Sequence, residues 1–523
     1  MSGKSSRVWF FFIPFVFAAV VLGQNEHDSL FALQGRLSSA LAEGTPMQGW
    51  MGARVVCLDN HQLIYATNDD RHFIPASNTK LFTVALALDR IGGDFRIRTS
   101  FYARQPLASD GTLQGDLVLA GRGDPAITGR LYHDDWRASL RPLVAALKNA
   151  GVNRVAGNLI ADSTWLRTDP YGSGWEWDDF VENYATPVSA LSFNDNIVKL
   201  TVRPGGVVSN VAELEWSPPA PFSTIENAIL TGAPTGKPAA IGYQRLPGSD
   251  RFTVHGSIPA GSAPWSTEVA CPNPASWFAS LLRSNLEEEG IAILGTNEIL
   301  LPTRTSRWLW SGWREIAHVD SPPVSELAAM VLKPSQNLYA QLLLLQTGSE
   351  CERSAREGEP YSASTHEQGG IQAMRRFLNT CGIAAEDVEI EEGSGLSRRN
   401  SVTPRATVTL LERMQTHRWH QAWIDALPIA GVDGTLRLRF TEGPAKGRVR
   451  AKTGSLRSVQ ALAGYASTAG GQTFAFAIYA NQFDSNQSVA VRKILDRFAE
   501  ELAGFSGKAE EVPGKTSAAP KPF

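Results

Sequence analysis

Three short motifs that lie far apart in the chain constrain its fold more than any other feature of the sequence. They are Ser77-Asn78-Thr79-Lys80, Ser335-Gln336-Asn337 and Lys452-Thr453-Gly454. One Ser-x-x-Lys tetrad is a weak signal, but the ordered set supplies a nucleophile, two amines, a second hydroxyl and an amide for acyl transfer through a serine ester. Because this chemistry needs Ser77 and Ser335 within hydrogen-bond reach, we expect the long segment between them to leave and re-enter one site.

The first two motifs predict the nucleophile and its proton relay. A serine hydroxyl is a weak nucleophile at neutral pH and needs a base. Lys80 follows Ser77 by one helical turn, and burial would lower the pKa of its amine enough for it to take the Ser77 proton. Ser335 can relay a proton to the leaving group, and Asn337 can orient a substrate amide. We therefore predict these four residues to be catalytic.

The third motif is expected on an edge strand beside the nucleophile. A protonated Lys452 would attract a substrate carboxylate and raise the potential around the base, which makes it the fifth predicted catalytic residue. The Thr453 hydroxyl can bind the same carboxylate, and Gly454 would let the substrate backbone approach the strand closely. The backbone N–H groups of Ser77 and Ser455 are the natural oxyanion hole. Thr453, Gly454 and Ser455 are therefore predicted to bind substrate.

The N-terminus has the pattern of an export signal. Lys4 and Arg7 precede an apolar run over residues 8–22, and polar residues follow it. A basic head, an apolar stretch and small residues at its end predict a signal peptide over residues 1–23 and a periplasmic protein. The alternative is an uncleaved membrane anchor, for which the run is of marginal length and is interrupted by Pro14. A peripheral association with the membrane stays open.

The pattern of apolar and turn-forming residues divides the remaining chain into two pieces of one domain and an insertion between them. Positions 81–88 are almost wholly apolar and predict a buried helix that begins near Pro75 and carries the first motif. Short alternating segments, separated by Gly, Pro, Asn and Asp, predict a β-rich insertion over residues 93–264. We therefore expect a discontinuous α/β (α+β) domain over residues 24–92 and 265–506.

The composition excludes several classes of protein. The net charge is −3 at pH 7, without the basic excess of a nucleic-acid binder, so no nucleic-acid partner is expected. The cysteines and histidines show no zinc-ligand spacing, and we predict neither a metal site nor a cofactor. Export would permit a disulfide, and Cys351 with Cys381 could close a loop. The tail over residues 507–523, rich in Lys, Glu, Pro, Ala and Ser, is predicted to be disordered.

The motifs and their surroundings resemble one branch of the penicillin-recognising serine enzymes. The stretches that carry the resemblance are Pro75-Ala76-Ser77-Asn78-Thr79-Lys80, Gly174-Trp175-Glu176-Trp177-Asp178-Asp179, Gly393-Ser394-Gly395-Leu396-Ser397-Arg398, Ala430-Gly431-Val432-Asp433-Gly434-Thr435-Leu436 and Lys452-Thr453-Gly454-Ser455-Leu456. They are similar to the class C low-molecular-mass penicillin-binding proteins, the D-alanyl-D-alanine carboxypeptidase/endopeptidase (penicillin-binding protein 4) family. The resemblance covers nearly the whole mature chain. It implies a serine β-lactamase/transpeptidase-like domain, an antiparallel sheet with helices on both faces, that carries a large insertion.

The resemblance also implies a reaction and a substrate. Ser77 would attack the peptide bond after the penultimate D-alanine of a peptidoglycan muropeptide, and water would hydrolyse the resulting acyl-enzyme. The same site could cleave cross-bridges, and β-lactams would acylate Ser77. In this family a pocket near the insertion reads the amino group of the substrate side chain, and Asp162 and Arg398 are the candidates here by their position. The oligomeric state is left open.

Three residues depart from the pattern of the family. Gln336 replaces an acidic residue that is often seen in the second motif, and Glu392 stands where an aspartate is expected before Gly393. Arg457 stands where a neutral polar residue is more familiar. A cation at this position could alter the preference for the third residue of the stem peptide.

The two alternative functions are a serine β-lactamase and a non-catalytic scaffold. A class A serine β-lactamase adds a glutamate four residues before an asparagine to activate the deacylating water. No glutamate between Asn337 and Lys452 has an asparagine four residues later, and together with the large insertion this favours the peptidase. A non-catalytic scaffold that binds the cell wall would not need to keep the five predicted catalytic residues.

Overall fold

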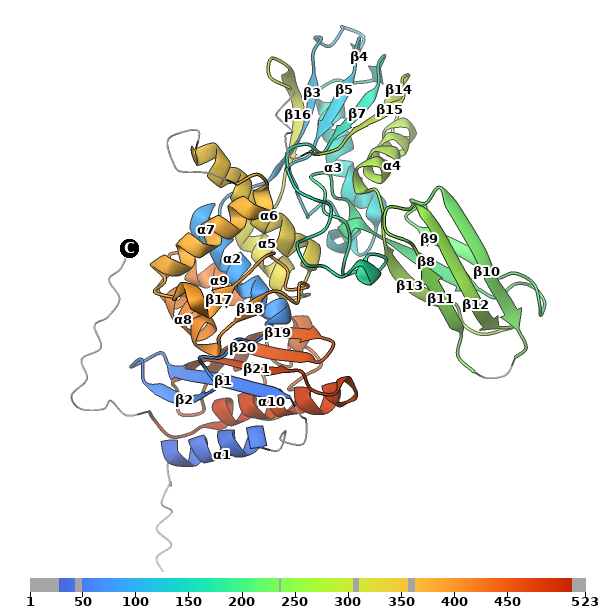
Figure 1. Ribbon diagram of the computed structural model, residues 1–523. Helices are drawn as coiled ribbons and strands as arrows, with labels where there is room; N and C mark the ends of the chain where they lie inside the picture. Colours follow the sequence, from blue (N-terminus) through green and yellow to red (C-terminus); the bar gives the residue numbers. More distant parts are fainter. Residues whose placement is uncertain (1–27, 43–48, 235–236, 304–309, 356–362, 510–523) are drawn as a thin grey trace, which may run out of the picture.

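The computed structural model of the chain describes residues 28–42, 49–234, 237–303, 310–355 and 363–509. The predicted signal peptide (1–23) and most of the predicted tail lie outside these residues. Figure 1 shows a body of helices and one sheet, from which two β-rich lobes extend. In the described part of the chain, no helix has the length and apolar character needed to cross a bilayer.

A five-stranded antiparallel sheet of order β19-β20-β21-β1-β2 forms the base of the body. The strands are β1 (Trp50–Cys57), β2 (Leu63–Thr67), β19 (Val449–Leu456), β20 (Val459–Ser467) and β21 (Thr473–Asn481). Helices α1 (Leu30–Ala42) and α10 (Ser488–Gly504) cover one face, and the remaining helices of the body lie on the other (Figure 1). Because both faces are covered, β20 and β21 are buried along nearly their whole length. This architecture confirms the predicted fold class.

Helix α2 (Thr79–Arg90) runs through the centre of the body and begins at the first motif. Its residues from Thr79 to Leu88 are all buried, as expected for a helix that is apolar on most sides. A short 3₁₀ turn, η2 (Ala76–Asn78), precedes it. The helices around it are α5 (Val324–Leu332), α6 (Asn337–Ala355), α7 (His366–Thr380), α8 (Pro404–Gln415) and α9 (His420–Ala426). The main core of the body is thus built around the helix that follows Ser77.

The segment between the first two motifs forms the two lobes. The first contains a mixed sheet of order β15-β7-β5-β3-β16 and a smaller one of order β14-β6-β4. Its elements are β3 (Arg98–Ala103), β4 (Thr112–Leu113), β5 (Leu117–Ala120), α3 (Trp136–Asn149), β6 (Arg154–Val155), β7 (Leu159–Asp162), α4 (Pro274–Glu288), β14 (Ala292–Ile293), β15 (Asn297–Leu300) and β16 (Arg314–Asp320).

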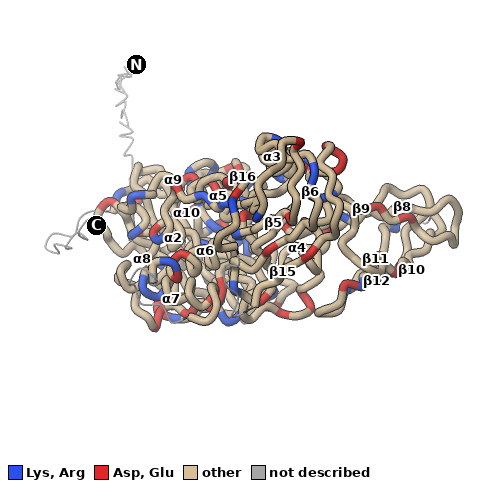
Figure 2. The backbone as a smooth tube through the Cα atoms, turned by 90° about the horizontal axis from the view of Figure 1, so that it is seen from above, with Lys and Arg blue, Asp and Glu red and all other residues tan. Residues whose placement is uncertain are grey.

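The second lobe contains two three-stranded sheets, of order β13-β8-β9 and β10-β12-β11. Its strands are β8 (Ile197–Arg203), β9 (Glu213–Ser217), β10 (Thr224–Gly232), β11 (Ala240–Gln244), β12 (Arg251–Pro259) and β13 (Trp265–Ala270). Figure 2, a view from above, shows this lobe pointing away from the body. Charges of both signs are scattered along the whole molecule in the same view.

The lobes end later in the chain than the sequence indicated. We expected the main domain to resume at residue 265, because helical texture returns soon afterwards. In the structure β13 pairs with β8 and β16 pairs with β3, so residues 265–320 stay with the lobes. Helix α4 shares the apolar core of these strands, and the amphipathic pattern of a helix does not say which core it joins. We therefore propose that the main domain resumes after Asp320.

All four cysteines carry free thiols. Cys351 lies on α6, and Cys381 follows the last residue of α7. The disulfide that the sequence allowed between these two cysteines is therefore not formed in the structure.

Candidate active site

The amine of Lys80 joins three of the segments that build the site. Its Nζ atom donates hydrogen bonds to Ser77 Oγ at 2.8 Å, to Asn337 Oδ1 at 2.5 Å and to the carbonyl of Ser394 at 2.6 Å. The side chain is fully buried. Burial lowers the pKa of Lys80 to about 7, against the opposing charge of Glu392. A neutral fraction near pH 7 fits the amine to accept the Ser77 proton.

The second motif lies at the start of α6, and its serine has a strained backbone. Ser335 has a φ of +67°, a left-handed conformation that residues other than glycine rarely adopt. Such strain is typical of functional sites, where surrounding contacts over-determine the conformation. Asn337 donates its amide N–H to the carbonyl of Tyr184 at 2.8 Å, which fixes the orientation that presents its oxygen to Lys80.

The third motif lies on β19, the edge strand of the sheet. The Nζ atom of Lys452 donates to Ser335 Oγ and to its neighbour's carbonyl, Thr453 O, each at 2.8 Å. The side chain is fully buried, and burial together with the nearby Lys80 charge holds the pKa of Lys452 well below its usual value. The Thr453 hydroxyl donates to Thr435 Oγ1 at 2.9 Å. Each of the two amines thus donates to one of the two serine hydroxyls.

Gly454 has a role in packing that the sequence did not indicate. A Cβ atom at this position would lie 2.5 Å from the carbonyl oxygen of Pro75 and 2.9 Å from the side chain of Ala461. The missing side chain therefore lets β19 approach the turn that carries Ser77. Ser455 follows on the same strand, and its Oγ accepts a hydrogen bond from Gln460 at 3.0 Å.

A cavity of about 510 Å³ opens in front of these groups. The groups of the motifs that line it are Ser77, Ser335, Asn337 and Ser455. It is also lined by charged and polar residues, which are Glu176, Asp178, Asp179 and Tyr184 from the segment before β8, and Arg398 and Arg457. The same cavity therefore carries groups for acyl transfer and charges of both signs.

The two residues predicted to read the substrate side chain have different outcomes. Arg398 lines the cavity, donates to the carbonyl of Arg457 at 3.0 Å and lies 3.5 Å from Glu176. Asp162 does not reach the cavity. It ends β7, is 1% exposed and accepts hydrogen bonds from the Trp310 indole and from the Thr164 backbone, so the prediction for Asp162 is wrong on geometry.

The sequence interpretation missed the acidic run that does line the cavity. Asp179 accepts a hydrogen bond from Tyr184 Oη at 2.8 Å, and partial burial raises the pKa of its carboxyl group. The signal was present in the stretch from Gly174 to Asp179, which carries three carboxylates in four positions. Three carboxylates so close together in the sequence can form a binding site for a cation or an amino group.

A second missed residue is Glu392, which is fully buried behind Lys80. Its carboxylate accepts hydrogen bonds from the backbone N–H groups of Ser394 at 2.7 Å and Gly395 at 2.6 Å, and from Asn400 Nδ2 at 2.8 Å. It also accepts from the Trp175 indole at 3.2 Å. Glu392 therefore holds the loop whose Ser394 carbonyl contacts the Lys80 amine.

No cluster of His, Cys, Asp and Glu suited to a metal ion occurs among the residues that the structure describes. The chemical groups in the cavity are instead a serine hydroxyl with a buried amine, a second hydroxyl on a second buried amine, and a carboxamide. This set can activate a nucleophile, pass a proton and orient an amide without any further group.

Comparison with known proteins agrees with this chemistry. The model of the D-Ala-D-Ala carboxypeptidase 3 (S13) family matches residues 33–502. A D-alanyl-D-alanine carboxypeptidase of Actinomadura sp. (strain R39) is 29% identical over 90% of this chain and 84% of its own length. The crystal structure of penicillin binding protein 4 (dacB) from Haemophilus influenzae has a TM-score of 0.74 at 24% identity, covering 89% of this chain and 98% of its own. A structure of the same protein complexed with a β-lactam has a TM-score of 0.69 at the same identity and coverage.

Proposed function

The chain belongs to the D-Ala-D-Ala carboxypeptidase 3 (S13) family, and from this premise we propose how its cavity performs that reaction. The enzyme is a serine-type D-Ala-D-Ala carboxypeptidase that acts on peptidoglycan stem peptides. The observation that carries the assignment of residues is the Lys80 amine, which bonds at once to the Ser77 hydroxyl and to the Asn337 amide. The same acyl transfer cleaves cross-bridges, in which the leaving amine belongs to a second stem.

Acylation begins at the pair of Ser77 and Lys80. Neutral Lys80 accepts the hydroxyl proton over 2.8 Å as Ser77 Oγ attacks the carbonyl carbon after the penultimate D-alanine. The backbone N–H groups of Ser77 and Ser455 stabilise the oxyanion. Asn337 orients the amide of the bound peptide.

Departure of the last D-alanine needs a proton on its nitrogen and a counter-charge for its carboxylate. Ser335, which accepts a hydrogen bond from Lys452, relays to the leaving nitrogen the proton that Lys80 took from Ser77, so that Lys80 is neutral again before deacylation. The carboxylate of the bound peptide favours the protonated form of Lys452, and this ammonium group and the Thr453 hydroxyl then hold the carboxylate. Water then attacks the ester on Ser77. Lys80 accepts a proton from this water and returns it to Ser77 Oγ, which frees the enzyme.

The charged part of the cavity selects the side chain of the stem peptide. Asp179 and its acidic neighbours attract an amino group, and Arg398 and Arg457 attract a carboxylate. A side chain that carries both groups at its end matches this arrangement. Asp162 has no part in this selection, because it lies inside the first lobe.

β-Lactams are the second class of ligand. They acylate the same hydroxyl, and the complex of the Haemophilus influenzae protein with a β-lactam supports binding at this place in the fold. Since peptidoglycan lies outside the cytoplasmic membrane, the enzyme is exported, and the pattern of residues 1–23 supports a periplasmic location.

The test uses purified cross-linked muropeptides. Wild-type protein releases free D-alanine and converts dimers to monomers, and Ser77→Ala protein does neither. Rapid, repeated turnover of a chromogenic cephalosporin would instead favour the β-lactamase alternative. Unchanged activity in the Ser77→Ala variant would favour a scaffold that uses none of these groups.

A further inference from the structure

A strained turn of the insertion contacts the second motif. Asn194, Asp195 and Asn196 have φ angles of +48°, +56° and +55°, three left-handed residues in succession without a glycine. Asn and Asp tolerate this conformation better than other side chains, but usually as single residues. A run of three persists only where the surroundings over-determine it.

Hydrogen bonds to the surrounding residues hold this turn in its left-handed conformation. The Asn194 backbone N–H donates to Ile127 O at 2.9 Å, and the Asn196 side chain donates to Pro187 O at 2.8 Å and accepts from the Phe193 backbone at 3.0 Å. These bonds tie both ends of the turn to the lobe. Contacts within the insertion therefore fix the position of the central residue, Asp195, independently of its contacts with the body.

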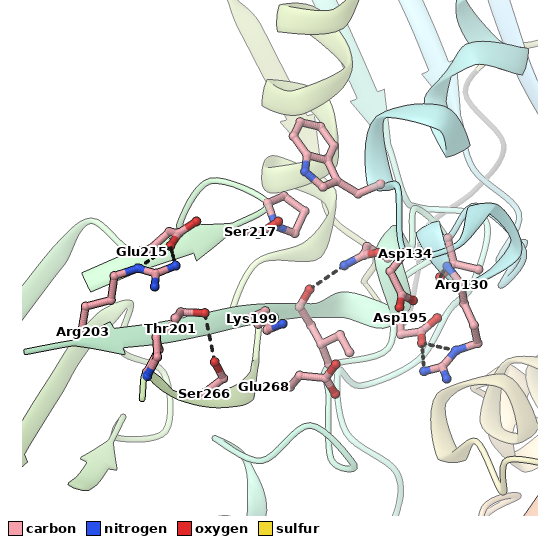
Figure 3. Close-up of a pocket in the computed structure, with 16 residues that line it drawn as sticks. Arg130, Asp134, Asp195, Lys199, Thr201, Arg203, Glu215, Ser217, Ser266 and Glu268 are labelled. Atoms are coloured by element: carbon pink, nitrogen blue, oxygen red, sulfur yellow. Dashed lines mark hydrogen bonds and ion pairs between the residues drawn. The ribbon is translucent and has the colours of Figure 1, made fainter. Parts of the chain in front are cut away.

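Asp195 is 4% exposed, and both oxygens of its carboxylate accept hydrogen bonds. One oxygen accepts from the Tyr339 hydroxyl, and the other accepts from Gln336 Nε2 at 3.0 Å and from Arg130 Nε at 2.9 Å. Hydrogen bonds to an ionised carboxylate are roughly twice as strong as those to a neutral acceptor, so Asp195 binds Tyr339 and Gln336 strongly. Figure 3 shows the pair of Arg130 and Asp195 at one end of a cavity of about 700 Å³.

One residue that Asp195 holds lies between the two reacting groups of the motif, and another follows them. Gln336 stands between Ser335, which receives the Lys452 hydrogen bond, and Asn337, which receives the Lys80 hydrogen bond. Tyr339 lies in the first turn of α6, directly after them. Fixing the Gln336 side chain therefore restrains both the strained φ of Ser335 and the direction of Asn337.

We infer that Asp195 is a positioning residue for acyl transfer, which holds Ser335 in its strained, productive conformation through Gln336 and Tyr339. The inference rests on the proposed function, since it assigns Ser335 the proton relay. It gives the insertion a part in positioning the catalytic groups, because a carboxylate of the insertion accepts a hydrogen bond from the second motif, which lies in the body. It also explains why an amide suits position 336, since an amide can donate to this carboxylate.

The test is Asp195→Asn, followed by the rate at which a labelled penicillin acylates the protein. Asparagine keeps the size of the side chain and tolerates the left-handed backbone, but it cannot accept from all these donors. A displacement of a reacting group by about 1 Å can cost about 100-fold in rate, so we expect a fall of about 10-fold to 100-fold. The initial binding constant should change less than the acylation rate constant.

The matched control is Asp387→Asn. Asp387 forms a similar two-bond pair with Arg405, and in both pairs the arginine side chain is 44% exposed while the carboxylate side chains are 3% and 8% exposed. Its carboxylate pairs with no residue of the three motifs, all of which the structure describes. This variant should keep the acylation rate of the wild type, and thermal denaturation should report any loss of stability in either variant.

A double-mutant cycle with Ser335→Ala separates positioning from general loosening. If Asp195 acts through Ser335, Asp195→Asn has little further effect on acylation once Ser335 is alanine. Full additivity, or equal rates for the Asp195 and Asp387 variants, would overturn the inference while leaving the proposed function intact. A wild-type protein that no penicillin acylates at Ser77 would remove the proposed function, and the inference with it.

Discussion

The Nζ atom of Lys80 lies 2.5 Å from Oδ1 of Asn337, a residue 257 positions further along the chain. Two lobes are built by the chain between them, and the second motif then returns to the start of α2. The same amine bonds to Ser77 and to the loop at Ser394. The site is therefore assembled around one buried amine, and its charge state controls the reaction.

The first prediction concerns the pH dependence of acylation. Burial lowers the pKa of Lys80 to about 7, and only the neutral amine can accept the Ser77 proton. The rate of acylation by a β-lactam should therefore rise as the pH passes through about 7 and level off above it. Stopped-flow measurements between pH 5.5 and 9 check this, and a rate that falls with rising pH over this interval would contradict it.

The second prediction concerns stability in the variant Lys80→Met. The folded state lowers the pKa of this amine from 10.5 to about 7, so the unfolded chain binds more protons between these values. The contribution of Lys80 to the free energy of unfolding therefore rises with pH across that window and is least favourable below pH 7.

Wild-type protein should accordingly gain stability relative to Lys80→Met between pH 7 and pH 10, by on the order of a few kcal/mol. Urea denaturation of both proteins at the two pH values gives the comparison. A difference between the two proteins that does not change with pH would show that burial does not perturb the amine.

The third prediction concerns Glu392→Gln. A glutamine cannot accept all the hydrogen bonds that this carboxylate receives, so the free energy of unfolding should fall by about 1–3 kcal/mol. The negative charge of Glu392 raises the pKa of Lys80, so its loss should move the midpoint of the acylation profile to lower pH. The neighbouring Glu391→Gln, whose side chain is 33% exposed, is the control that should show neither change.

The fourth prediction concerns the choice of substrate. Asp179→Asn should raise the KM for stem peptides whose third residue carries an amino group, by about 10-fold, because a charge-assisted hydrogen bond is lost. For a peptide with alanine at that position the KM should stay the same. Steady-state release of D-alanine from the two peptides measures the contrast, and an equal increase for both would assign Asp179 a structural role instead.

The sequence predicted the local elements better than it predicted their partners. The buried helix that begins near Pro75 and the antiparallel strands of the third motif were expected, since their apolar patterns are strong. Our proposal to move residues 265–320 to the lobes needed the strand pairing, because a pattern of apolar residues shows that a helix or strand has a core but not which core it joins.

Residue types and motif spacing also limited the prediction of the site. Its position in the sequence made Asp162 a candidate for the substrate pocket, but it ends an inner strand and bonds to Trp310. Asp195 could not be predicted, because its contact with Gln336 depends on three left-handed residues that no propensity of Asn or Asp specifies in succession. The motifs thus predict the catalytic groups, whereas the residues that position these groups can be identified only from the folded structure.

The account depends most on Ser77 as the acylated nucleophile. Mass spectrometry of the protein after incubation with a labelled penicillin, followed by peptide mapping, tests this directly. The account predicts one adduct per chain, on the peptide that contains Ser77, and none in the Ser77→Ala variant. An adduct on any other residue, or an adduct that persists in the Ser77→Ala variant, would contradict it.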